Sequence, residues 1–553
     1  MYSVKVIGTE HMKIFTFFHR SEKSTVSAAL ILMFSLLVAN LLGLLKLRLF
    51  ANLFGGASSE LGVFLAADRI PNFVFNVLAV GALSSSFIPI FSKLIAGGQK
   101  ERALGFSSSL FNFSILVFLL FTLVFLAFPE IFLGIISWGN LSPNERSLLV
   151  DLSKILFLAQ IFFILSAFSS GILQSFNQFT SVALSPVVFN LAVIVFSLFF
   201  SQKMGIYAAA WGTVLGAFCH FLVQIPALLR VGFSYRFSLN LRDRLFLEIG
   251  RIFLPRSLSL VVDQISLLVF TSYALSLSAS SVVVYNFAQR IEMIPVVLFG
   301  STFAQASFAT LSKNAEIGDS EFLKTFQKTF SYLSFLIIPA SVFLVVLRIP
   351  LIRIFFGARG FDWNATLLTA YTLSFFALGM FFQAQVALLA RSFFALKNSR
   401  VPFLASLASL ILGLGLGLVF IKVLNFGVWS LGLSESLISA LEFLILYLFL
   451  KKKFDLLGRG DFIFPVFKII IAAFVAGLVS YSILRFLDLR GPLFDTRYFV
   501  SLLGLTALSL LVGLVVYLTL CYKMGIREGE KVVLLLRKTR NFGPNFLKEL
   551  FQE

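Results

Sequence analysis

The segment YNFAQRIEMIPVVLFGSTFAQ, residues 285–305, places an arginine and a glutamate inside an otherwise apolar stretch. Arg290 lies near the middle of this stretch, counted from either polar flank, and Glu292 follows two residues later. A charged side chain is costly in a lipid bilayer, and where one is kept it usually faces the bundle interior or a water-filled cavity. Because the middle of a span is too deep for the side chain to reach the headgroups, we predict that Arg290 has a functional role.

The composition of the whole chain indicates that its solvent is lipid. Of the 553 residues, 59% are hydrophobic and 13% are charged, about half the charged fraction of an average soluble domain. The mean hydropathy is +0.96. Apolar runs of about 20 residues recur along the chain, which is the length of a helix that crosses the hydrocarbon. Backbone groups in lipid must bond within their own segment, so we predict an all-α integral membrane protein with about 14 transmembrane helices.

Two of the predicted spans are unusual. The apolar runs at 61–92 and 281–311 are longer than a bilayer requires, and they contain Pro71 and Pro295. Proline removes a backbone donor and kinks a helix. The number of spans therefore depends on how these two runs are divided.

The basic residues predict the orientation. If the N-terminus is cytoplasmic, every second loop is rich in Lys and Arg, as at 93–102, 313–324 and 451–459, and so is the tail from 523. This asymmetry follows the positive-inside rule, and it explains the net charge of +19 better than a nucleic-acid partner does. We expect both termini to be cytoplasmic. The first apolar run has no small-residue cleavage site after it, so we expect it to remain in the mature protein.

An internal repeat predicts the domain organisation. Pro129 and Pro350 lie 221 positions apart, and the pairs Arg69–Arg290 and Asn177–Asn398 share this separation. An offset that covers six spans predicts two six-helix lobes related as parallel repeats, with two extra C-terminal helices. The predicted parts are a cytoplasmic N-terminal segment (1–25), an N-lobe with helices 1–6 (26–230), a cytoplasmic linker (231–251), a C-lobe with helices 7–12 (252–450), helices 13–14 (463–521) and a basic cytoplasmic tail (522–553).

No residue pattern indicates an enzyme. The three histidines have no second His or Cys at metal-ligand spacing, and no paired acid or nucleophile stands out. We therefore predict a transporter without a metal or an organic cofactor.

The ionisable residues within the predicted spans are the candidates for a binding site. They are Lys46, Arg48, Asp68, Arg69, Arg256, Asp263, Arg290, Glu292 and Glu435. Cations outnumber anions, which favours an anionic ligand such as a phosphate or pyrophosphate, bound by the two-pronged donors of Arg and the point charge of Lys.

Structural alternatives stay open for several of these residues. Lys46 and Arg48 could reach the outer headgroups, and Arg256 could be a headgroup anchor. Asp68 and Arg69 could form structural pairs across helices. Glu292 could be the counter-charge of Arg290, although residues two apart do not face each other on a helix.

Several motifs resemble the MurJ (MviN) lipid II flippases of the multidrug/oligosaccharidyl-lipid/polysaccharide exporter superfamily. They are RIPNFVFNVLAVGALSSSFIPIFSK (69–93), FSSGILQSFNQFTSVALSPVVFNLAVI (168–194), FLPRSLSLVVDQISLLV (253–269), YNFAQRIEMIPVVLFG (285–300) and LLARSFFALKNSRVP (388–402). The resemblance spans most of residues 26–450, with the motifs in the order typical of the family.

The resemblance implies a fold of 14 helices, with two six-helix lobes in a V and two further helices that line a groove for a lipid tail. It implies a flippase in the bacterial inner membrane that moves undecaprenyl-pyrophosphate-linked peptidoglycan precursor outward for cell-wall synthesis and cell shape. The family's cavity is cationic, and Arg290 matches its arginine in the eighth helix. Cell-wall synthases are expected partners.

The sequence departs from the family pattern in the first lobe. The family's first helix reads roughly S-R-x-L-G-x-x-R-D, whereas this chain has Asn40 at one arginine, Lys46 at the other and Leu47 at the acid. In the second helix, Phe75 and Asn76 stand where the family often has an arginine pair, and Val80 replaces a glutamate. The first lobe is therefore less cationic than the family implies.

We therefore expect a lipid II flippase that works by alternating access. The candidates for binding pyrophosphate are Arg290, Lys46, Arg69, Arg256 and Arg48. Asp263 and Glu435 are candidates for a coupling cation, Na⁺ or H⁺, and the membrane potential is an alternative driving force. Alternative functions are a flippase for another polyprenyl-linked glycan or an exporter of organic cations on the same scaffold.

Overall fold

The computed structural model describes residues 25–77, 87–137, 141–233, 235, 237, 244–357, 361–454, 463–489 and 498–532. Every regular element within these ranges is a helix, which confirms the all-α prediction. Twelve helices there are long and apolar enough to cross a membrane, and Val261–Leu277 is a shorter apolar helix. The predicted number of about 14 spans is not established by this set.

The chain divides into two compact units. The first comprises Met1–Val283 with Ala358–Asp362, and the second comprises Val284–Gly357 with Trp363–Glu553. The change from one unit to the other falls within a single helix, α13 (Ala279–Pro295). The lobe boundaries inferred from the sequence stay a prediction.

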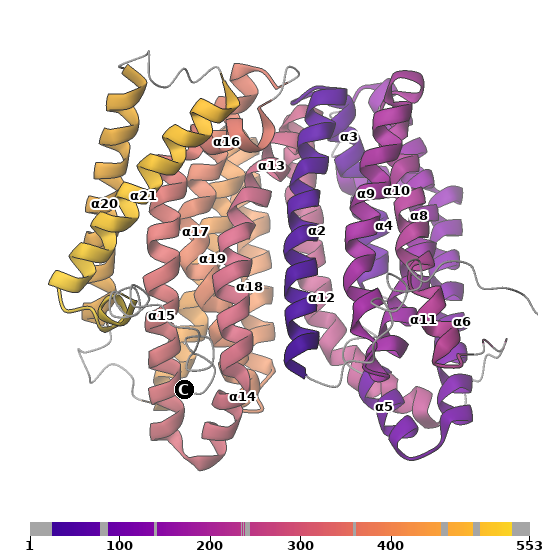
Figure 1. The fold of residues 1–553 in the computed structure, drawn as a ribbon. Helices are drawn as coiled ribbons and strands as arrows, with labels where there is room; N and C mark the ends of the chain where they lie inside the picture. The colour runs from indigo at the N-terminus through magenta and orange to yellow at the C-terminus, as the bar shows by residue number, and fades with distance from the viewer. Residues whose placement is uncertain are drawn as a thin grey trace, which may run out of the picture. The chain divides into compact units, whose positions relative to one another are not determined.

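The first unit is organised around α8. Its helices are α2 (Thr25–Phe54), α3 (Ser59–Ala67), α4 (Arg69–Phe75), α5 (Ile88–Ala96), α6 (Lys100–Ala127), α7 (Pro129–Ser137), α8 (Pro143–Ser175), α9 (Phe179–Met204), α10 (Tyr207–Leu222), α11 (Ile225–Arg230) and α12 (Arg244–Leu277). α8 packs against α3, α4, α5, α6 and α10, while α2 lies along α9 (Figure 1). α8 starts at a capping box, in which Ser142 and Glu145 bond each other's backbone N–H groups.

The second unit is organised around α17. Its elements are the rest of α13, the π-helix η3 (Val296–Ser301), α14 (Thr302–Ile317), α15 (Asp319–Val346), α16 (Arg348–Phe356), α17 (Trp363–Ala395), α18 (Arg400–Leu418), the π-helix η4 (Val419–Val423), α19 (Trp429–Phe454), α20 (Ile463–Leu489) and α21 (Phe499–Lys523). α17 packs against α14, α15, α16 and α19. The two C-terminal helices, yellow and orange in Figure 1, reach this unit mainly through the contact of α20 with α15.

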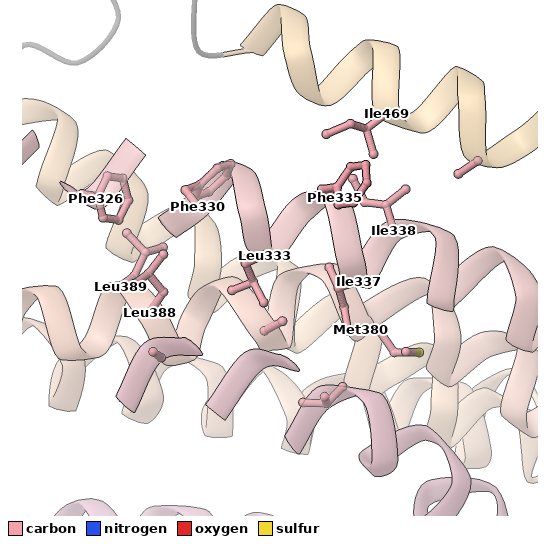
Figure 2. Packing of buried hydrophobic residues seen from close by; sticks show 14 of the residues in the cluster. Phe326, Phe330, Leu333, Phe335, Ile337, Ile338, Met380, Leu388, Leu389 and Ile469 are labelled. Carbon is pink, nitrogen blue, oxygen red and sulfur yellow. The ribbon is translucent and has the colours of Figure 1, made fainter. Parts of the chain in front are cut away.

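The core of the second unit lies on both sides of α15. Figure 2 shows Leu333 and Ile337 of α15 towards Leu388 and Met380 of α17, whereas Phe335 faces Ile469 of α20. Lipid tails are as apolar as these side chains, so close packing and interhelical hydrogen bonds hold the helices together here.

Interhelical hydrogen bonds reinforce this core. The hydroxyl of Tyr517 on α21 donates to the carbonyl oxygen of Phe335 at 2.7 Å. The amide of Gln385 on α17 donates to the Ser334 hydroxyl oxygen at 3.0 Å. Both donors are buried, and a buried donor without a partner would cost roughly 1–3 kcal/mol. These bonds therefore fix how α17 and α21 are rotated against α15.

Large apolar side chains cover the outside of the helices. Phe199 on α9 is 76% exposed and Val500 on α21 is 77% exposed. Such surfaces are unfavourable in water but suit the hydrocarbon of a bilayer. The chain is thus a multi-pass membrane protein, as its composition predicts.

The two units repeat the same local turns. Left-handed backbone occurs at Asn177 (φ 57°) and again at Lys397 (φ 59°), 220 positions later. In both turns, the next residue's N–H bonds back across the turn: Gln178 donates to Leu173 at 2.8 Å, and Asn398 donates to Phe393 at 2.9 Å. This is the Schellman type of helix end.

Further pairs keep the same spacing. Two further pairs of residues with positive φ, Gly98 and Gly318, and Gly205 and Asn425, are also 220 apart. The two prolines that suggested the repeat both lie at the start of a short helix. α7 starts at Pro129 itself, and α16 starts at Arg348, two residues before Pro350. The local turns therefore recur at almost the spacing from which the repeat was predicted, and the organisation into two repeated lobes stays a prediction.

The two long apolar runs have different outcomes. In the run at 61–92, the helix breaks at Asp68, three residues before Pro71. The break places Pro71 in the first turn of the new helix α4, where a missing backbone N–H is tolerated. Residues 78–86 lie outside the described residues. The run at 281–311 lies within one continuous helical span, Ala279–Ile317. There the chain adopts the π-helix η3 directly after Pro295.

We predict that Gly62→Ala destabilises the protein. A Cβ at Gly62 on α3 would lie 1.8 Å from the Ala279 carbonyl oxygen, so the two backbones would have to separate. Overpacking of this kind costs about 1–3 kcal/mol, and thermal melting of the purified protein in detergent measures it. Gly43→Ala is the matched control, because nothing lies within 4 Å of a Cβ there. Equal melting temperatures for the two variants would contradict the close approach.

Candidate substrate-binding site

In the first unit, an aromatic ring supports Lys46. The ammonium of Lys46 on α2 lies 4.8 Å from the centre of the Phe189 ring on α9. Lys46 is half-buried and lies about two turns before the end of α2. A cation over an aromatic face gains about 0.5–1 kcal/mol when exposed and about 2 kcal/mol or more when desolvated. Phe189 therefore fixes the position of this charge within the span.

The support continues into a cluster of aromatic rings. Phe163 on α8 packs against Phe189 with ring centroids 5.3 Å apart. Phe163 also contacts Phe75 of α4, with ring centroids 5.9 Å apart. Phe75 thus belongs to the aromatic cluster that supports Lys46. Its own side chain has no charge with which to bind an anion.

A buried polar network lies next to these rings. The His220 ring on α10 contacts Phe163 at 5.6 Å between ring centres, and its Nδ1 atom is 2.6 Å from the Ser166 hydroxyl oxygen. The buried amide of Gln224 donates to the hydroxyl oxygens of Ser166 at 2.6 Å and of Ser185 at 3.0 Å. These bonds join α8 and α9 to His220 at the end of α10 and to Gln224 in the turn between α10 and α11, which holds the aromatic cluster in place.

The other candidate cations of the first unit lie near helix ends. Arg48 is half-buried on α2, and Arg69 is half-buried at the first position of α4. The Asp68 carboxylate accepts a hydrogen bond from the Asn72 amide. Asp68, at the junction of α3 and α4, is therefore hydrogen-bonded to α4.

The candidates on α12 have separate outcomes. Asp263 has an exposed side chain, and the next residue, Gln264, accepts a hydrogen bond at 3.3 Å from Asn76, which directly follows α4. Arg256 belongs to α12, but its side chain lies outside the described residues.

In the second unit, α13 separates its two charged residues. Arg290 is exposed, whereas Glu292 has no exposed surface. Neither Glu292 carboxylate oxygen has a hydrogen-bond partner. Residues two apart point about 200° apart around a helix. Glu292 is therefore not the counter-charge of Arg290, and the arginine presents its charge on another side of the helix.

Glu435 lies in a hydrogen-bonded group within the second unit. Its Oε1 atom accepts a bond from the Tyr285 hydroxyl and a longer one, 3.4 Å, from the Gln289 amide. Tyr285 and Gln289 are one turn apart on α13, while Glu435 comes from α19. This group joins the two helices.

An arginine that the sequence analysis did not select braces η3. The Arg391 guanidinium on α17 donates to the Ser301 carbonyl oxygen at 2.7 Å and to the Gln305 side-chain oxygen at 2.8 Å. A π-helix interrupts the regular i→i−4 pattern, and Arg391 binds a carbonyl at its last residue. The signal in the sequence was an arginine six residues before the polar turn at Lys397.

Comparison with known proteins identifies the family. The family model described as lipid II flippase MurJ matches residues 50–499. The chain belongs to the MurJ lipid II flippase family. This confirms the predicted resemblance and a transporter class instead of an enzyme class.

Curated relatives and solved structures agree with this membership. A probable lipid II flippase MurJ of Buchnera aphidicola subsp. Acyrthosiphon pisum is 27% identical over 457 residues, covering 82% of this chain and 89% of the relative. The lipid II flippase MurJ of Burkholderia cenocepacia is 27% identical over 429 residues, covering 75% and 82%.

Among solved structures, a lipid II flippase MurJ in an inward closed conformation is similar, with a TM-score of 0.75 and 25% identity, covering 90% of this chain and 98% of the other. An inward-facing multidrug resistance MATE family transporter has a TM-score of 0.65 at 16% identity and covers 76% and 96%, which indicates a shared fold.

We predict that Phe189→Leu weakens the function of Lys46. Leucine fills much of the space but has no ring face, so the cation–π contact of about 1 kcal/mol is lost, equivalent to about fivefold in ligand affinity. Binding of inorganic pyrophosphate to the purified protein measures the effect. Phe196→Leu on the same helix is the control, since Phe196 stacks on Phe200. Unchanged affinity in Phe189→Leu would separate the ring from the site.

We also predict that Arg391→Met destabilises the second unit. Methionine keeps the apolar stem but leaves the Ser301 carbonyl without its charged donor, and such bonds contribute about 1.5–3 kcal/mol. Thermal melting in detergent checks this. Arg400→Met, at an exposed position at the start of α18, should leave the melting temperature unchanged. A variant at Arg391 as stable as wild type would remove its bracing role.

Proposed function

We propose that this chain moves lipid II, the undecaprenyl-pyrophosphate-linked peptidoglycan precursor, from the inner to the outer leaflet of the bacterial inner membrane by alternating access. Membership of the MurJ family over residues 50–499 supports this function. Lipid II delivered to the outer leaflet would supply cell-wall synthesis and thus cell shape. Both termini would be cytoplasmic, as the distribution of Lys and Arg favours.

The observation that carries the proposal is the exposed Arg290 on α13. It belongs to the span Ala279–Ile317, well away from either end. A charge at such a depth in lipid is strongly unfavourable unless it faces a polar interior. The negatively charged headgroup of a lipid also loses its hydration when it crosses the hydrocarbon. A protein cation can replace the lost water by binding the phosphate oxygens.

The pyrophosphate would bind Arg290 through paired N–H···O bonds, which suit the planar guanidinium. Lys46, held over Phe189, adds a point charge. Arg69, Arg48 and Arg256 are further candidates for contact with the phosphates. Their positive charges together favour an anionic ligand over an organic cation.

The polyprenyl tail would stay in lipid against α20 and α21. These helices expose long apolar side chains, among them Phe464, Phe467 and Phe474 on α20 and Leu511 and Val515 on α21. The apolar tail then does not have to leave the lipid while the charged headgroup crosses the membrane. Cell-wall synthases that use the exported precursor would be the partners of the protein.

The driving force would be the membrane potential or a cation gradient. One charge that crosses 100 mV is worth about 2.3 kcal/mol. Glu435, which accepts bonds from Tyr285 and Gln289, and Asp263 are candidates for binding Na⁺ or H⁺.

The reduced charge of the first unit favours one alternative substrate class. Asn40 and Phe75 stand where the family pattern implied arginines, and Phe75 packs into an aromatic cluster. A polyprenyl-linked glycan with a different head would use the same pyrophosphate contacts. Lipid II and such a glycan differ in the sugar and peptide groups, so direct competition between them in vesicles distinguishes the two.

We predict that Arg290→Ala abolishes transport and that Arg290→Lys retains part of it. Lysine keeps the charge but cannot form the paired bonds. The measurement is the exposure of lipid II on the outer leaflet in cells depleted of their own flippase, at equal protein levels. Arg400→Ala is the control for losing an arginine at an exposed helix end.

Two outcomes would count against the proposal. Full transport by Arg290→Ala would exclude Arg290 from the binding site. Failure of the intact chain to restore lipid II exposure, when it reaches the membrane in normal amounts, would exclude lipid II as the substrate.

A further inference from the structure

Glu292 has an unusual environment for an ionisable side chain. It has no exposed surface, and neither carboxylate oxygen has a hydrogen-bond partner. The Gln383 side chain on α17 lies close to it, but its amide does not reach hydrogen-bond geometry with either oxygen. A buried carboxylate without donors or a counter-cation costs far more than a neutral carboxylic acid at the same place. The environment therefore favours the protonated form.

A second carboxyl group lies next to this part of α13. Glu435 on α19 is held against α13 by Tyr285 and Gln289, and Gln289 is about one turn before Glu292, so a charge on Glu435 would repel a charge on Glu292. Two neighbouring carboxyl groups in a dry site rarely ionise together, and the proton goes to the one with fewer donors. Glu435 has two donors, the Tyr285 hydroxyl and the Gln289 amide, whereas Glu292 has none. The pair therefore divides into a hydrogen-bonded carboxylate, Glu435, and a neutral acid, Glu292.

Among the described residues, the other groups that surround the pair are neutral or acidic, apart from Arg290. α17 contributes the neutral Gln383, and α19 contributes the acidic Glu435. On α13 itself, Tyr285 donates to Glu435. The side chain of Arg290 is exposed, whereas that of Glu292 is fully buried. α16 contacts α13 through the rings of Phe356 and Phe287, 4.2 Å apart, one to two turns before Glu292.

We propose that Glu292, paired with Glu435, is a proton-binding site, and that release of its proton accompanies the conformational change of transport. The coupling to transport rests on the proposed function, whereas the proton site itself does not. In the state that the structure describes, Glu292 holds the proton. When α13 moves and water reaches the carboxyl group, the O–H bond breaks and the proton passes to that water, which leaves a solvated carboxylate.

The position of Glu292 suits such a movement. Pro295 and the π-helix η3 begin three and four residues later, so the regular hydrogen-bond ladder ends next to the pair. Helices kink where a proline or a π-turn interrupts the ladder. The exposed Arg290 lies on the same turn of α13, so a movement that exposes Glu292 also displaces the cation proposed to bind pyrophosphate.

Infrared difference spectroscopy of the purified full-length protein tests the proton site without any substrate. A neutral carboxylic acid without hydrogen bonds has a separate carbonyl stretch. Wild type should show this band at neutral pH and lose it on alkalinisation, and Glu292→Gln should not show it. Glu442→Gln is the matched control, because Glu442 is another half-buried acid of α19 and accepts a bond from Ser406 at 2.8 Å. It should retain the band.

Absence of the band from wild type at neutral pH would overturn the proton site, and this result needs no variant to fold. A band that persists in Glu292→Gln would assign the proton to another residue and overturn the site equally.

Transport measured against pH tests the coupling. In vesicles containing lipid II, wild type and Glu442→Gln should change rate with pH, while Glu292→Gln, permanently neutral, should lose that dependence. A wild-type pH profile in Glu292→Gln would overturn the coupling. If the intact chain moves no lipid II but shows the band, the proposed function fails and the proton site stands.

Discussion

A charged side chain in hydrocarbon needs a polar partner, a proton or a path to water, and this constraint governs how α13 is used. The helix carries a cation and an acid two residues apart, and their side chains point in different directions into different environments. Arg290 is exposed, whereas Glu292 is enclosed without a donor. Tyr285 and Gln289 use another part of the same helix to bind Glu435 of α19. One helix therefore supplies the proposed anion contact and the proposed proton site.

The first unit meets the same constraint with aromatic rings. Lys46 lies over Phe189, and Phe163 connects that ring to Phe75. Where the resemblance implied a further arginine, the chain has Phe75, whose ring belongs to the aromatic cluster behind Phe189. Fewer charges then need to be stabilised in the span, since a ring carries no desolvation penalty comparable to that of a guanidinium.

The internal repeat preserves turns more closely than chemistry. The left-handed residues recur at a spacing of 220, as at Asn177 and Lys397, because each must end a helix where the next span begins. The regions around the repeated arginines differ: α3 and α4 break at Asp68, while α13 continues into η3 after Pro295. Duplicated scaffolds can diverge in this way, because turn geometry sustains the fold while interior polar groups are set by what they bind.

The amino-acid sequence by itself determined the membrane class, the all-helical fold, the spacing of the recurring turns and the positions of interior charges. Hydropathy, turn residues and proline act locally, so these features do not depend on neighbouring helices. Only the tertiary structure decided which way each charge points and what meets it. Phe75 meets Phe163, and Tyr285 meets Glu435 from 150 residues away. The rotation of a helix about its axis is fixed by the helices packed against it, and an almost uniformly apolar span carries little record of that rotation.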